Sequence, residues 1–201
     1  MASVELRVLD TRIGARFKRP RGSDIIVGTA TTLARLFERV TATLGSNKLS
    51  RLSVCCHGYE GGVADDRMAM SRMGGGFGLQ LGQDDLTFDT VGAFNLLSGK
   101  FAAGGQMDIY ACAAAEDSSS TGFTGNGRLL MRELAGQINA TVRASDSIQT
   151  YNAGVVTTTI FGIPVYSEYE GVDFGEWEGN VWLFLPDGSR RQDRRPGRGV
   201  S

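Results

Sequence analysis

The sequence predicts an α/β fold in which helices pack against a mainly parallel β-sheet. Over residues 30–146, segments with apolar side chains at helical spacing alternate with short apolar segments typical of buried strands. This alternation is the order of a parallel sheet with crossover helices. Residues 154–184 are rich in β-branched and aromatic side chains separated by glycine and proline, which predicts β hairpins. The chain has 201 residues, a length typical of one domain.

The first part of the chain predicts two strands and a helix. Residues 4–9 alternate in character and predict a strand, whereas the polar residues 12–24 predict a loop. Residues 24–28 form a short apolar segment, which we expect to be a second strand. A helix follows, because threonines favour its start, Gly45 favours its end, and apolar residues recur between them at helical spacing. These apolar residues are Leu33, Leu36, Phe37, Val40 and Leu44.

The next segment predicts a buried strand that leads into a histidine. Residues 52–56 are mostly apolar and are followed directly by His57 and Gly58. Residues 59–76 are rich in glycine and methionine and predict a loop. Residues 77–81 alternate in character, which predicts an edge strand.

A second helix and a second buried strand are predicted before a cysteine. Asp89 or Thr90 is the expected N-cap of this helix, because a side-chain oxygen there can accept a backbone N–H. The helix is predicted from the spacing of Val91, Phe94, Leu97 and Phe101. Residues 106–111 then predict a strand that runs into Cys112, and the small and polar residues 113–127 predict a loop.

The last part of the chain predicts a third helix, a further strand, the hairpins and a tail. The third helix is predicted from the spacing of Leu130, Leu134 and Ile138. Residues 141–144 predict a strand that ends at Ser145 and Asp146. Residues 189–201 carry five arginines and one aspartate and almost nothing apolar, which predicts a disordered tail. The folded domain is therefore expected to span residues 1–188.

Composition and charge exclude several classes of protein. The net charge of −1 gives no sign of a nucleic-acid partner, and the arginines of the tail lack interleaved aromatic residues. Three cysteines do not form a disulfide scaffold, and one histidine excludes histidine-rich zinc sites, so neither a metal nor another cofactor is expected. No apolar segment is long enough for a membrane span, and the first residues lack the apolar core of a signal peptide, so a cytoplasmic location is expected.

Three predicted strands end in residues that are suited to chemistry. His57 and Gly58 follow one strand, Cys112 follows the next, and Ser145 and Asp146 follow the third. Parallel strands end at the same edge of a sheet, where ligands of such folds bind. A thiol and an imidazole that meet there can act as nucleophile and general base. Considered singly, a cysteine at a strand end is more often a small buried side chain, and a single histidine is more often a hydrogen-bonded structural residue.

The order and context of this pair resemble those of the caspase-like cysteine peptidases, the group of caspases, legumains, gingipains, clostripain and separase. In that group a hydrophobic strand ends in His-Gly, and a later one ends in Ala-Cys, as at His57-Gly58 and Ala111-Cys112. The likeness covers about residues 24–188 and extends to an uncharacterised bacterial family of caspase-like domains. It implies a three-layer α/β/α sandwich around a mainly parallel sheet, with late β hairpins.

The resemblance also implies catalytic roles. Cys112 is the implied nucleophile and His57 the implied general acid and base. The backbone N–H of Gly58, with that of Cys112, is implied to stabilise the oxyanion. No third catalytic residue is required in the group, and the sequence suggests none.

The third strand end is the expected substrate-binding segment. Asp146, beside Ser145, is expected to face the cleft, where its carboxylate can pair with a substrate arginine or lysine. Alternatively, Asp146 caps its own loop, as aspartate in turns often does. Asp108 lies in the middle of a predicted strand, and a structural contact is expected for it.

The predicted function is that of a cysteine endopeptidase acting on protein or peptide substrates, with a preference for basic residues as one option. We expect it to be regulated by a protein partner, a small ligand or self-cleavage. Two alternatives remain open: a catalytically silent caspase-like module that binds a partner, or another cysteine-dependent acyl hydrolase or transferase.

Overall fold

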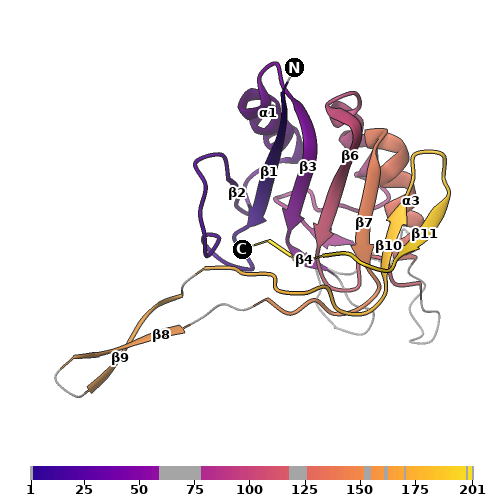
Figure 1. The fold of residues 1–201 in the computed structure, drawn as a ribbon. Helices are drawn as coiled ribbons and strands as arrows, with labels where there is room; N and C mark the ends of the chain where they lie inside the picture. Colours follow the sequence, from indigo (N-terminus) through magenta and orange to yellow (C-terminus); the bar gives the residue numbers. More distant parts are fainter. Residues whose placement is uncertain are drawn as a thin grey trace.

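The chain forms an α/β fold around a seven-stranded, mostly parallel sheet (Figure 1). The computed structural model describes residues 2–58, 78–117, 126–151, 155–160, 163–169, 171–197 and 199–200. The strand order is β11-β10-β7-β6-β3-β1-β2. The strands β2, β1, β3, β6 and β7 run parallel, β10 is antiparallel to β7, and β11 is antiparallel to β10. Their bounds are Ser3–Asp10 (β1), Ile25–Val27 (β2), Lys48–Cys55 (β3), Phe101–Tyr110 (β6), Thr141–Ser145 (β7), Val181–Phe184 (β10) and Arg190–Asp193 (β11).

Two short two-stranded sheets complete the β-structure of the described residues. His57–Gly58 (β4) pairs with Leu79–Gln80 (β5), and Val155–Ile160 (β8) pairs with Ile163–Tyr169 (β9). In Figure 1 the β8–β9 ribbon extends away from the edge of the large sheet. The predicted α/β fold with late antiparallel strands is therefore confirmed.

All three described helical elements pack on one face of the sheet. They are the α-helices Leu33–Leu44 (α1) and Gly127–Ile138 (α3) and the 3₁₀ helix Val91–Leu97 (η2), and their apolar side chains join those of the sheet in one large core. The Thr32 hydroxyl accepts the Arg35 N–H and begins α1, as threonine at an N-cap does. Gly45 ends α1 with a φ of 57°, where residues with a Cβ are strained.

The opposite face is covered by irregular segments, so the three-layer α/β/α prediction is met on one face only within the described residues. Leu9, Cys55 and Tyr110 point to this face and form a second apolar cluster with the irregular segments, to which Phe17 and Phe174 belong. The physical reason is that charged side chains alternate with the apolar ones here. Buried arginines need acceptors, and irregular chain offers free carbonyl groups where a helix does not.

Two buried arginines show how these segments are held. The Arg7 guanidinium pairs with Asp24 at 2.7 Å and donates to the Arg19 carbonyl. Arg143 pairs with the fully buried Asp108 at 2.7 Å and donates to the Pro196 carbonyl. The structural contact predicted for Asp108 is thus confirmed.

Two expectations about elements need correction. Residues 91–101 do not form an α-helix: the 3₁₀ helix ends at Leu97, and Phe101 begins β6, because Gly99 adopts a φ of 71° and turns the chain. The predicted disordered tail is wrong for Arg190–Asp193, which is strand β11. Backbone pairing with β10 holds this segment. The predicted loop 59–76 and Phe77 lie outside the described residues, and β5 begins at Leu79.

No helix in the described part of the chain combines the length and apolarity needed to cross a membrane.

Candidate active site

The parallel strands bring the three predicted strand ends to one edge of the sheet. The strand β3 pairs with β6, and β6 pairs with β7, so all three end side by side. His57 follows β3, Cys112 follows β6, and Ser145 is the last residue of β7. Figure 1 shows the arrowheads of β1, β3, β6 and β7 along this edge, beside β4.

Gly58 lies directly against the main chain of Cys112. A methyl group on Gly58 would collide with the Cys112 carbonyl group and would lie 3.0 Å from its backbone nitrogen. Only glycine permits this close approach, because every other residue carries a Cβ. The strand that carries His57 is therefore packed onto the residue that carries the thiol.

Cys112 is held in a turn that the loop after β7 fixes. Its Sγ lies 3.7 Å from the Gln149 carbonyl oxygen, to which the thiol can donate. The next residue, Ala113, has a φ of 49°, a strained conformation for alanine. The Ala113 N–H donates to the Ser147 carbonyl at 2.9 Å, which stabilises this turn. Non-glycine residues with such backbone strain cluster at functional sites.

Cys112 is half-buried, whereas Cys55 and Cys56 are buried. Burial raises the pKa of the Cys55 and Cys56 thiols well above the ordinary value, because a thiolate is poorly solvated in the core. Of the three cysteines in the chain, Cys112 is the one placed to react.

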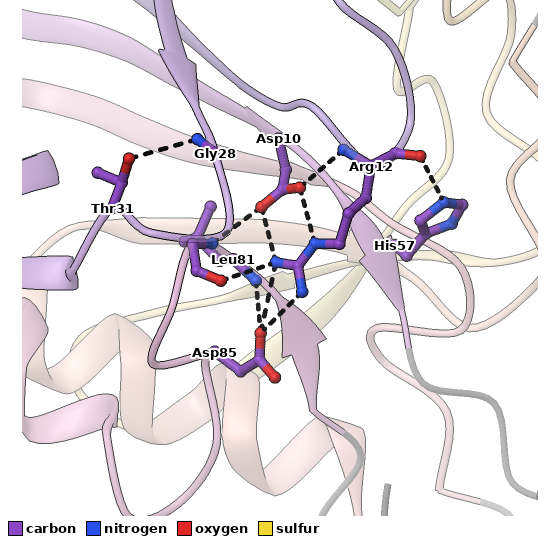
Figure 2. Close-up of polar contacts among 8 residues, drawn as sticks. Asp10, Arg12, Gly28, Thr31, His57, Leu81 and Asp85 are labelled. Carbon is purple, nitrogen blue, oxygen red and sulfur yellow. Dashed lines mark hydrogen bonds and ion pairs between the residues drawn. The ribbon is translucent and has the colours of Figure 1, made fainter. Parts of the chain in front are cut away.

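The His57 ring contacts a backbone carbonyl of the loop after β1. Its Nε2 lies 3.3 Å from the Arg12 carbonyl oxygen (Figure 2). A carbonyl oxygen only accepts, so Nε2 carries the proton of this hydrogen bond, and Nδ1 is the nitrogen left for proton exchange with another group. The Arg12 carbonyl thus orients the ring in the way that a third catalytic group does.

Tyr151 lies beside both His57 and Cys112. Its ring meets the His57 ring edge-on, with the centroids 6.2 Å apart. Burial raises the pKa of Tyr151, and the nearby Cys112 thiolate adds to the increase. Tyr151 is anchored by a β-bridge to Phe174, so it forms a fixed apolar wall of the site.

The Arg12 side chain belongs to a cluster with two aspartates (Figure 2). The Arg12 Nε and Nη2 donate to the two carboxylate oxygens of Asp10 at 2.8 and 2.7 Å, and its Nη1 lies 3.4 Å from Asp85 Oδ1. Asp10 is fully buried at the end of β1. Burial alone would raise the pKa of Asp10, but hydrogen bonds from Arg12 and Gly82 outweigh it, so the pKa lies below its ordinary value.

The two predicted substrate-binding residues make contacts within the chain. Ser145 is buried, and its hydroxyl donates to the Glu178 carbonyl. The Asp146 carboxylate accepts from the Asn180 backbone N–H at 2.9 Å and from Trp182 Nε1 at 3.1 Å. Burial acts to raise the pKa of Asp146, but these hydrogen bonds prevail and lower it. The loop-capping alternative therefore describes Asp146, and a preference for basic substrates loses the observation that motivated it.

The sequence analysis missed three groups of this site. Gln149 and Arg12 take part through backbone carbonyls, and a backbone atom leaves no trace in residue type. Tyr151 follows the predicted strand by several residues, and its contact with His57 depends on how the loop folds back. Within the described residues, no cluster of three or more histidine, cysteine, aspartate or glutamate side chains is arranged to hold a metal ion.

Comparison with known proteins finds no matching family model, no matching curated protein and no matching solved structure.

Proposed function

We propose that the protein is a caspase-like cysteine peptidase in which Cys112 is the nucleophile and His57 the general acid and base. The observation that carries the proposal is the packing of Gly58 onto Cys112, which joins the histidine strand to the least buried thiol at the carboxyl edge of the sheet. The orientation of His57 by the Arg12 carbonyl supports it. The parallel sheet with a late antiparallel strand supports a caspase-like arrangement.

The proposed reaction has two halves. The Cys112 proton passes to His57 Nδ1, and the thiolate sulfur forms a bond to the substrate carbonyl carbon. The backbone N–H groups of Gly58 and Cys112 stabilise the oxyanion. His57 then gives the proton to the leaving amine as the C–N bond breaks. In the second half, water gives one proton to His57 and attacks the thioester, and the acid product leaves as Cys112 regains its proton.

The proposed substrate is a protein or peptide bound in extended form along this edge. Asp146 is assigned to the loop that supports Cys112, because its carboxylate ties that loop to Asn180 and Trp182. In this proposal, side-chain preference is set by residues other than Asp146. Control by a partner, a ligand or self-cleavage remains part of the proposal.

A peptide with an electrophilic carboxyl-terminal group tests the function. Wild type should be labelled at Cys112, identified by mass spectrometry, and His57→Ala should be labelled much more slowly. Cys55→Ala is the matched control and should be labelled like wild type, because Cys55 is buried.

The outcomes separate the alternatives. Labelling together with peptide cleavage supports the peptidase. Labelling with acyl transfer but no cleavage supports the transferase alternative, and absence of labelling in a folded protein supports a silent binding module.

A further inference from the structure

We propose that the Asp10–Arg12 ion pair, with Asp85, is a positioning device that holds His57 in one tautomer and one orientation. The inference rests on the proposed function for its catalytic meaning. It assigns a role to three charged residues that the sequence analysis did not connect with the site. None of the three is proposed to touch the substrate; they act through the His57 ring and the strand that carries it.

The first link runs from the ion pair to the ring. Arg12 is the second residue after β1, at the start of a long connection to β2. Asp10 accepts from its backbone N–H at 3.0 Å as well as from its guanidinium, so both ends of Arg12 are tied to the end of β1. The peptide group between these two ties presents the carbonyl to His57 Nε2.

The second link runs from the same cluster to the backbone of His57. His57 pairs with Gln80 in the β4–β5 ladder, and the turn that follows β5 contacts the cluster. Asp10 accepts the Gly82 N–H at 2.8 Å, and Arg12 donates to the Gly82 carbonyl at 3.0 Å. The cluster therefore fixes both the ring acceptor and the partner strand of the histidine relative to β1.

The turn is built so that it cannot easily shift. Asp85 has a φ of 54°, and its carboxylate accepts the Leu81 N–H at 3.1 Å. Gly82 has a φ of 65°, and a Cβ there would collide with the Thr31 carbonyl oxygen. Such strained positions persist only where surrounding contacts enforce them. The Asp10–Arg12 pair supplies several of those contacts.

The chemical consequence concerns the proton on His57. While Nε2 donates to the carbonyl, the neutral ring carries its proton on Nε2 and leaves the Nδ1 lone pair available to accept the Cys112 proton. If the carbonyl moves, both tautomers become accessible and only part of the molecules are competent. We therefore expect the charged cluster to affect turnover rather than substrate binding.

Nuclear magnetic resonance on the imidazole nitrogens tests this inference directly, because the chain has one histidine and its signals need no assignment. In alkaline solution, where the ring is neutral, wild type should show the Nε2–H tautomer alone. Asp10→Asn and Arg12→Ala should show a mixture, and Arg12→Lys, which keeps the charge but lacks the fork of donors, should lie between them. If the protein cleaves peptides, kcat should fall about 10- to 100-fold with KM little changed.

The matched control is Asp24→Asn, which breaks the other buried ion pair of the β1 region, Arg7–Asp24, on the opposite face. It should lower stability but leave the His57 spectrum unchanged. A wild-type tautomer in folded Asp10→Asn and Arg12→Ala would overturn the inference, and so would an equal spectral change in Asp24→Asn. Because the spectrum needs no turnover, a protein without peptidase activity can still confirm or refute the positioning role.

Discussion

Cys112 differs from the other two cysteines in its surroundings, and this difference predicts its reactivity. Burial keeps Cys55 and Cys56 protonated, whereas Cys112 is half-buried beside the histidine strand. Because the thiolate is the reactive form, brief treatment with iodoacetamide should modify Cys112 first. Mass spectrometry of the digested protein measures the order. Equal modification of all three cysteines in the folded protein would contradict the assignment.

Gly58 should be far less tolerant of a side chain than an exposed glycine. Gly58→Ala places a methyl group against the Cys112 main chain and should lower the unfolding free energy by about 1–3 kcal/mol and abolish labelling of Cys112. Gly136, exposed within α3 with no atom near its added Cβ, is the control. Gly136→Ala should raise the unfolding free energy by about 0.5–1 kcal/mol, because alanine favours helix. Similar effects of the two substitutions in urea titrations would refute the close contact.

Asp146 is expected to matter for stability and not for substrate choice. Asp146→Ala removes the acceptor for Asn180 and Trp182 and should lower the unfolding free energy by about 1.5–3 kcal/mol. Any preference among cleavage sites in a peptide library should stay as in wild type. A selective loss of cleavage after arginine and lysine would instead restore Asp146 as a substrate-binding residue.

At the scale of elements, β11 shows how a strand can form from a segment that composition marks as disordered. Arg190–Asp193 has no apolar side chain, so hydrophobic patterning predicts nothing for it. The segment is held by backbone pairing with β10, by the Arg190 guanidinium over the Trp182 ring at 5.6 Å, and by Asp193 near Arg143. These are contacts with distant partners, which local patterns do not reveal.

Removal of residues 189–201 should therefore destabilise the whole domain. The truncation exposes the β10 edge and takes two acceptors from the buried Arg143, which should lower the unfolding free energy on the order of 2–4 kcal/mol in urea titrations. Arg191→Ala, which removes an exposed charge but keeps the strand, is the control and should be close to neutral. An equal loss in the control, or no loss on truncation, would contradict the role of β11.

At the scale of the whole molecule, two aspartates make stability depend on acid. The pKa values of Asp10 and Asp146 are lowered in the folded protein, so each contributes stability above the unfolded aspartate pKa of about 3.9 and loses it as pH falls further. The unfolding free energy should be steady near neutral pH and fall steeply below about pH 4. In Asp10→Asn the acid limb should be shallower, because one depressed carboxyl is gone. An unchanged slope would show that Asp10 is not responsible.

The sequence predicts much of the fold because its apolar periodicity reflects the core. The stripes of α1 and α3 and the buried strands β3 and β6 coincide with predicted elements, and strand direction alone brings His57 and Cys112 to one edge. The irregular cover of the second face and the carbonyl of Arg12 could not be predicted. They depend on where buried arginines find acceptors and on backbone atoms that every residue type shares.

Cleavage of a peptide library by wild type, Cys112→Ala and His57→Ala, compared side by side, tests the central claim most directly. Circular dichroism should show that all three are folded, because neither side chain belongs to the buried core. We expect the wild type to cleave and both variants to lose cleavage, Cys112→Ala completely. Cleavage at wild-type rate by either folded variant would contradict the Cys112–His57 mechanism.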